Sequence, residues 1–230
     1  MAGDIPALYF IGVQQSPELE LLPGNYAALV FHEEQMGFRA GAVAGLVTQS
    51  GRAAAVCEVE FIDAVRRACD GFRRGAEYAH PAIDVEVSFR SGPEELLFRD
   101  PEWGTAAAAL RIDRGADVVF AIGEGTAEAA LKAAAKRGAL VIGAETDQYR
   151  QLPELGTALV TSAILDVRGA LLALVQETVE GRFRAGRHWG EVGLAPFHEF
   201  SGRLPATVQS RLAEITNDIR LDVIHLDPVQ

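Results

Sequence analysis

The stretch Leu140-Val-Ile-Gly-Ala-Glu-Thr-Asp-Gln148 indicates the fold class more directly than any other part of the chain. An apolar run that passes through glycine into polar side chains is typical of a strand in an open parallel sheet, which binds its ligand at the carboxyl edge. Glu145 and Asp147 can accept hydrogen bonds from hydroxyl groups, and Gln148 can both donate and accept them. The stretch therefore predicts a polyhydroxylated, sugar-like ligand rather than a phosphate.

Short β-rich runs alternate with helical patterns along the chain, which is the signature of βαβ units and a mostly parallel sheet. The expected strands are Tyr9–Val13, Ala27–Phe31, Ala53–Cys57, Val85–Phe89, Val118–Ile122, Leu140–Ala144 and Thr157–Thr161. The expected helices are Glu33–Gln49, an amphipathic helix with Phe61, Val65, Ala68, Phe72 and Ala76 on one face, Trp103–Asp113, Thr126–Arg137, Ser162–Glu180, and a last helix from near Pro205 to near Arg220. Gly181–Gly202 is predicted to be rich in loops, with short antiparallel strands around His188–Leu194.

The loops after the predicted strands are expected to converge on one ligand site, because doubly wound sheets bind ligands at the carboxyl ends of their strands. The candidate contacts are Glu58, Phe98, Gly123, Glu124, Gly125, Thr126, Glu145, Asp147 and Gln148. Phe98 beside Asp100 offers an apolar ring next to a carboxylate, which suits a planar ring attached to a hydroxylated group. Structural roles stay open for all of them: solvated or capping acids, a tight glycine turn with Thr126 as N-cap, and a packing role for Phe98.

The composition excludes several classes of function. The formal net charge is −11, with 21 Lys and Arg against 32 Asp and Glu, so nucleic acids and anionic lipid surfaces are not expected as partners. The sequence has no P-loop, no G-x-S-x-G elbow and no metal-spaced histidines, so neither a cofactor, a metal nor nucleophilic catalysis is predicted. Cys57 and Cys69 are too few for a disulfide framework, and we expect buried free thiols.

Seven segments in chain order carry a resemblance to a known family. They are Phe31–Gly41, Phe61–Gly75, Phe98–Pro101, Gly115–Phe120, Gly123–Thr126, Ile142–Gln148 and Thr161–Ser162. In this order and spacing the chain resembles the basic membrane protein family of ABC transporter substrate-binding proteins, whose best-understood members are purine nucleoside receptors. By position, Phe98 resembles the aromatic residue that stacks on the base, and Glu145 resembles the aspartate that binds the ribose. Gly123–Thr126 looks like the turn that lets the backbone approach the ligand.

The resemblance implies a periplasmic-binding-protein-like α/β fold with two doubly wound parallel-sheet lobes. The first lobe would comprise residues 1–50 and 157–230, and the second residues 51–156. A purine nucleoside would bind between the lobes without chemistry, and the partner would be an ABC permease. Family members are extracytoplasmic and anchored to the membrane as lipoproteins.

The chain departs from the family at three places. Glu145 stands where an aspartate is usual, and Leu165 stands where a lysine is usual. The third departure is at the start, where roughly a third of a usual receptor is expected to be missing from the first lobe. Residues 1–6 show no export signal, so the chain as written would be cytoplasmic.

Two alternatives to a transport receptor stay open. In one, a repurposed or truncated regulatory or scaffold protein keeps the lobe architecture, forms a homodimer and binds little or no nucleoside. Dimerisation would cover the sheet edge that the missing strands expose. In the other, an enzyme acts on nucleosides with Glu145 or Asp147 as the general acid or base.

Overall fold

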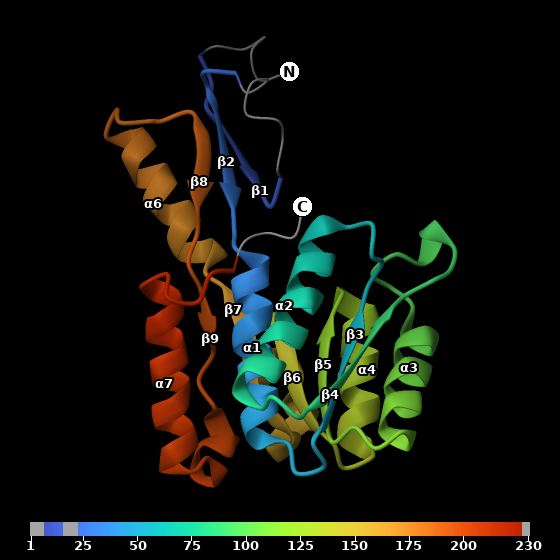
Figure 1. The fold of residues 1–230 in the computed structure, drawn as a ribbon. Coiled ribbons are helices and arrows are strands. Elements are labelled where there is room, and N and C mark those ends of the chain that lie inside the picture. The colour runs from blue at the N-terminus through green and yellow to red at the C-terminus, as the bar shows by residue number, and fades with distance from the viewer. Residues whose placement is uncertain (1–6, 16–22, 227–230) are drawn as a thin grey trace. The chain divides into compact units, whose positions relative to one another are not determined.

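The computed structural model describes residues 7–15 and 23–226, and Figure 1 shows its helices and strands. Contacts divide the chain into two compact units, which are Met1–His32 with Leu165–Val192, and Glu33–Ile164 with Gly193–Gln230. The predicted lobes, 1–50 with 157–230 and 51–156, have other boundaries, and that lobe assignment stays a prediction. The predicted absence of an export signal concerns residues 1–6, which lie outside the described part of the chain.

The first unit contains a three-stranded parallel sheet. β2 (Tyr26–Val30) lies in the middle and pairs with β1 (Phe10–Val13) on one side and with β8 (Gly186–Trp189) on the other. α6 (Val167–Val179) belongs to the same unit and begins after Asp166, whose carboxylate accepts a hydrogen bond from the N–H of Gly169.

The second unit is built on a six-stranded sheet with the order β4-β3-β5-β6-β7-β9, in which the pairs from β4 to β7 are parallel. Its strands are β3 (Arg52–Cys57), β4 (Asp84–Phe89), β5 (Val118–Ile122), β6 (Leu140–Glu145), β7 (Leu159–Leu165) and β9 (Val192–Leu194). Its helices are α1 (Glu33–Val47), α2 (Asp63–Ala79), α3 (Pro101–Asp113), α4 (Glu124–Lys136), α5 (Gln148–Gln151) and α7 (Ala206–Arg220), with the short 3₁₀ helices η3 (Glu94–Leu96), η4 (Pro153–Ala158) and η5 (His198–Arg203). This alternation confirms the predicted α/β class.

β5 shows how the second unit builds its core on both faces of the sheet. All five of its residues are buried, and successive side chains of a strand point to opposite faces. Phe120 stacks on Phe72 of α2, with ring centroids 5.0 Å apart. Val119 faces the other way and packs in a cluster with Leu131 of α4. Figure 1 accordingly shows α2 in front of the sheet and α4 behind it.

α1 and α2 pack very closely, because glycines line the contact face of each helix. A Cβ added at Gly41 would overlap the carbonyl oxygen of Phe72, and one added at Gly75 would overlap that of Phe38. The same close approach to backbone atoms of the facing helix occurs at Gly37, Gly45 and Gly71. Side chains larger than hydrogen at these positions would force the two helices apart.

Cys57 and Cys69 form a disulfide, so the prediction of free thiols is wrong. Cys57 ends β3, and Cys69 lies on the buried face of α2 with Val65 and Phe72. Their Cα atoms are 6.7 Å apart, within the span that a disulfide bridges. The sequence pattern does not reveal this pairing, because it depends on how α2 returns over β3.

Three predicted boundaries are also wrong. Residues 162–165 continue β7 and pair with β6, so the helix predicted from Ser162 begins only at Val167. α2 begins at Asp63, which leaves Phe61 in the preceding loop with 68% of its surface exposed. α4 begins two residues before Thr126, at Glu124. The antiparallel strands predicted around His188–Leu194 are found only in part. β8 pairs in parallel with β2. β9 lies beside β7 and runs antiparallel to it, since the N–H of Asp166 donates to the carbonyl of Glu191 and the N–H of Ala195 to that of Ser162.

Candidate functional site

The predicted contacts on the loops after β3, β4 and β5 come together at one edge of the six-stranded sheet. These strands are parallel neighbours, so their carboxyl ends lie at the same edge. A Cβ added at Gly123 would lie 2.7 Å from the Cβ of Glu58, and one added at Gly125 would lie 3.2 Å from the carbonyl oxygen of Phe98. Gly123 has a φ of 130°, which an L side chain rarely adopts. Glycine is therefore required for these loops to touch.

Three of the predicted contacts have left-handed backbone conformations: φ is 61° at Phe98, 44° at Glu124 and 65° at Glu145. Such conformations are uncommon outside glycine and cost on the order of 1–3 kcal/mol each. Glu124 is exposed, and Phe98 and Glu145 are partly exposed. Strained residues at the carboxyl ends of three strands of one sheet are typical of a binding site, where the surrounding structure holds side chains in position for a ligand.

Glu58 is fully buried and forms an ion pair with Arg90, whose side chain is also fully buried. The guanidinium of Arg90 donates to Glu58 through Nε, to the carboxylate of Asp100 at 3.3 Å and to the carbonyl of Pro93 at 3.2 Å. Arg90 thereby joins the loops after β3 and β4 to the start of α3. Glu58 has no exposed surface left for a ligand. Its predicted contact with the ligand stays a prediction, and this geometry does not favour it.

The electrostatics of this cluster make Glu58 and Arg90 depend on each other. Burial alone would lower the pKa of Arg90, but the hydrogen bonds and negative charges of Glu58 and Asp100 raise that pKa above its ordinary value. Oε2 of Glu58 is buried without a hydrogen-bond partner among the described residues. Removal of either partner would leave a buried charge without compensation.

Asp100 attaches the loop that carries Phe98 to two helices. Its carboxylate caps α3 by accepting a hydrogen bond from the N–H of Trp103 at 3.0 Å. Its own N–H donates to the hydroxyl of Thr126, also at 3.0 Å, and Thr126 is buried. The hydroxyl of Thr126, a candidate contact, thus holds the Phe98 loop instead of capping α4.

Asp147 has a structural role at the start of α5. One carboxylate oxygen accepts a hydrogen bond from the N–H of Tyr149, and the other lies 2.9 Å from Nε2 of His198. The His198 ring stacks on Tyr149, whose hydroxyl donates to Glu199 at 3.2 Å and whose pKa is raised by that carboxylate. Asp147 therefore joins α5 to η5, and its predicted ligand contact stays a prediction.

Gln148 is held by the strands beside it. Its N–H donates to the hydroxyl of Ser162 at 3.0 Å, and its side-chain amide donates to the hydroxyl of Thr146 at 3.3 Å. Glycine is required at position 143, because a Cβ on Gly143 would overlap the Cγ of Gln148 and lie 2.8 Å from the hydroxyl of Ser162. Gln148 packs against β6, and its part in ligand binding stays a prediction.

Sequence reasoning missed two central residues of this edge, Arg90 and His198. A signal for Arg90 existed: Cys57 and Phe89 are paired in register at the ends of β3 and β4, so the next residues, Glu58 and Arg90, are opposite charges on adjacent strands. His198 offered no such signal, because its approach to Asp147 depends on the path of the chain after β9.

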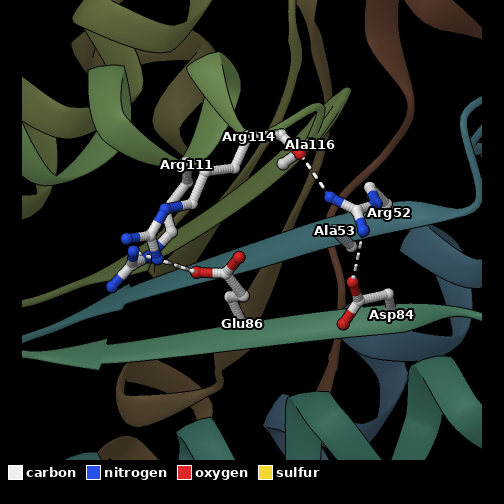
Figure 2. Close-up of a pocket in the computed structure, with 7 residues that line it drawn as sticks. All are labelled: Arg52, Ala53, Asp84, Glu86, Arg111, Arg114 and Ala116. Atoms are coloured by element: carbon white, nitrogen blue, oxygen red, sulfur yellow. Dashed lines mark hydrogen bonds and ion pairs between the residues drawn. The ribbon is translucent and has the colours of Figure 1, made fainter.

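The cavity in Figure 2 lies at the opposite, amino end of the sheet. Arg52 and Asp84 begin β3 and β4 and form an ion pair of 3.1 Å, and Glu86 pairs with Arg111 and Arg114 at 2.9 Å. Its volume is about 10 Å³, which is space for one water molecule. The charged groups form ion pairs with one another, so we assign the cavity a structural role.

Two absences apply to the described part of the chain. No group of three or more His, Cys, Asp or Glu side chains there could hold a metal ion. Within residues 7–15 and 23–226, no helix has the length and apolarity needed to span a membrane.

Comparisons with known proteins agree with this architecture. The family model for PnrA-like ABC transporter substrate-binding proteins matches residues 4–193. An ABC transporter solute-binding protein from Conexibacter woesei superposes with a TM-score of 0.77 at 20% sequence identity, covering 99% of this chain and 74% of that one. This likeness confirms the predicted periplasmic-binding-protein-like fold.

Two curated relatives show how varied the similar proteins are. The chain is 25% identical over 199 residues to the transcriptional activator protein med of Bacillus subtilis, covering 83% of this chain and 57% of that protein. It is 30% identical over 192 residues to basic membrane protein B of Borrelia garinii subsp. bavariensis, covering 78% and 53%. The chain thus spans about half the length of these relatives.

Proposed function

The chain belongs to the PnrA-like family of ABC transporter substrate-binding proteins, and from this premise we propose that it binds a purine nucleoside and delivers it to an ABC permease. No bond is made or broken in this function. The ligand stabilises one conformation of the protein, and the permease distinguishes that conformation from the unliganded one.

One observation carries the proposal: the left-handed Phe98, Glu124 and Glu145 lie at or just after the carboxyl ends of β4, β5 and β6, at one edge of the sheet. The ring of Phe98 is suited to stacking on a planar base, and the carboxylate of Glu145 can accept hydrogen bonds from vicinal ribose hydroxyls. Two carboxylates at this edge, in a chain of net charge −11, disfavour a phosphate group. A neutral nucleoside therefore fits better than a nucleotide.

We expect Glu145→Ala to weaken nucleoside binding by roughly 10- to 100-fold, because a hydrogen bond to a charged group contributes about 1.5–3 kcal/mol. Phe98→Ala should weaken the binding of inosine and guanosine more than that of free ribose, because only the bases lose a stacking partner. Isothermal titration with the four ligands inosine, guanosine, cytidine and ribose measures both effects. Glu95→Ala and Leu96→Ala, exposed changes on the neighbouring η3, serve as controls.

Unchanged affinity in Glu145→Ala would remove this carboxylate from the site. An equal loss for inosine and ribose in Phe98→Ala would argue against stacking. Failure of the folded wild-type chain to bind any of the four ligands would refute the function itself.

We propose an extracytoplasmic location, with membrane anchoring as in the family. The disulfide between Cys57 and Cys69 supports it, since disulfides persist in oxidising compartments and are rare in the cytosol. Protein isolated from its native cell with its thiols blocked should show no reactive thiol after denaturation without reductant, by titration with a thiol reagent. Detection of two thiols per chain would place the protein in a reducing compartment.

A second candidate is a regulatory protein, and the observation that favours it is the similarity to the transcriptional activator protein med. The net charge of −11 argues against direct contact with DNA, so such a regulator would act on another protein or as a homodimer. Sedimentation analysis with and without inosine separates the candidates. A stable dimer that neither binds inosine nor changes in its presence would favour regulation, whereas saturable binding of inosine would favour transport.

A further inference from the structure

Phe61 is an exposed aromatic residue at the same sheet edge as the candidate site. It lies in the loop between β3 and α2, and 68% of its surface is exposed. Figure 1 shows this connection, where cyan turns to teal, at the same end of the sheet as the green connection from β4 to α3. The described residues leave the ring largely exposed, although a phenylalanine buries a large apolar area wherever it can.

The loop that carries Phe61 is fixed at several points. The disulfide from Cys57 to Cys69 closes the chain around it, and the buried ion pair with Arg90 holds Glu58. Within the loop, the N–H of Ile62 donates to the carbonyl of Val59 at 3.4 Å. The exposure of Phe61 therefore belongs to an ordered loop, and an ordered loop loses little conformational freedom when its side chain meets a ligand.

Phe61 is connected to the other contacts of the edge through Glu58. Glu58 touches Gly123, since a Cβ on that glycine would lie 2.7 Å from the Cβ of Glu58. Phe61 follows Glu58 by three residues, a span of at most about 11 Å. β3 lies between β4 and β5, so its loop emerges between the Phe98 loop and the turn at Gly123.

We infer that Phe61, rather than Glu58, is the residue of the β3 loop that contacts the ligand, and that it does so by stacking on a planar ring. Glu58 and the disulfide hold the loop, and Phe61 supplies the contact surface. With Phe98 it gives the edge two aromatic side chains from neighbouring strands. The inference rests on the proposed function, and it makes the planar base, rather than the sugar, the part of the ligand that decides specificity.

The test is isothermal titration of Phe61→Ala and Phe61→Tyr with inosine, guanosine and free ribose. We expect Phe61→Ala to weaken nucleoside binding about 10-fold and ribose binding much less, as for loss of one stacked ring. Phe61→Tyr keeps the ring and should bind like the wild type. Since Phe61 is exposed, its variants should keep the wild-type thermal midpoint, which confirms that they are folded. Leu96→Ala, which removes an apolar side chain that is 39% exposed, is the matched control.

A second arm tests the loop. Cys57→Ser with Cys69→Ser should weaken nucleoside binding in the wild-type background, because the loop loses its order. The same pair of changes should have little further effect in Phe61→Ala, where the contact is already gone.

The outcomes separate the inference from the function on which it rests. Nucleoside binding that Phe98→Ala weakens and Phe61→Ala leaves unchanged would overturn the inference alone. An equal loss for ribose and inosine in Phe61→Ala would overturn stacking on the base. A folded wild type that binds neither nucleosides nor ribose would overturn both the inference and the function.

Discussion

Gly41→Ala is expected to lower the free energy of unfolding by about 3 kcal/mol or more, at the upper end of the cost of overpacking a core. The added Cβ would overlap the carbonyl oxygen of Phe72, which is a backbone atom of α2 and cannot rotate away as a side chain can. Relief requires the two helices to separate, and that would disturb the stacked rings of Phe72 and Phe120 beneath them. Urea unfolding followed by circular dichroism measures the loss.

Gly202→Ala is the matched control, because no atom lies within 4 Å of the Cβ that it would add. Its free energy of unfolding should stay within about 0.5 kcal/mol of the wild type. If Gly41→Ala proved as stable as this control, α1 and α2 would have to lie further apart than the structure shows.

Arg90→Met should lower the free energy of unfolding by about 3–5 kcal/mol, the usual cost of leaving one member of a buried ion pair alone. Glu58 would keep a buried carboxylate with no cation, and Asp100 and Pro93 would lose a donor. The double change Glu58→Leu with Arg90→Met should recover most of the loss, because it removes both charges. Guanidinium chloride unfolding of the two variants measures the difference.

Arg114→Met provides the control at the other end of the sheet. Arg114 pairs with Glu86, but its side chain is 53% exposed, and exposed ion pairs contribute about 0–1 kcal/mol. A small loss in Arg114→Met and a large one in Arg90→Met would show that burial, rather than ion pairing as such, sets the cost. Equal losses would contradict the role that we assign to the buried cluster.

Much of the fold follows from hydrophobic pattern, because the second unit alternates short apolar strands with helices. β5 was predicted with its observed bounds, Val118–Ile122, since a buried run bounded by polar residues and glycine has a single plausible extent. The extent of β7 was harder to predict. Residues 162–165 are small or apolar and fit a helix as well as a strand, and their pairing with β6 decides between the two.

The sequence predicted the position of the candidate site but not the role of each side chain in it. Strand order brings the β3, β4 and β5 loops together as expected, because parallel neighbours share a carboxyl edge. The role of each loop residue depends on which other side chains it contacts across the sheet edge, and the sequence does not show these contacts. Glu58 was thus predicted as a contact, although Arg90 buries it, and Phe61 was predicted inside a helix that begins only at Asp63.

The parallel sheet of the first unit also sets an order of folding. β2 pairs with β8, so Val30 must find Trp189 after the whole stretch that forms α1 to β7 has been made. Pairing across so long a loop carries a large closure entropy and is slow compared with local contacts. During synthesis, β1 and β2 leave the ribosome long before β8, so β2 stays unpaired on its β8 side until then. Most of the second unit can fold meanwhile, and only β9, η5 and α7 of that unit are made after β8.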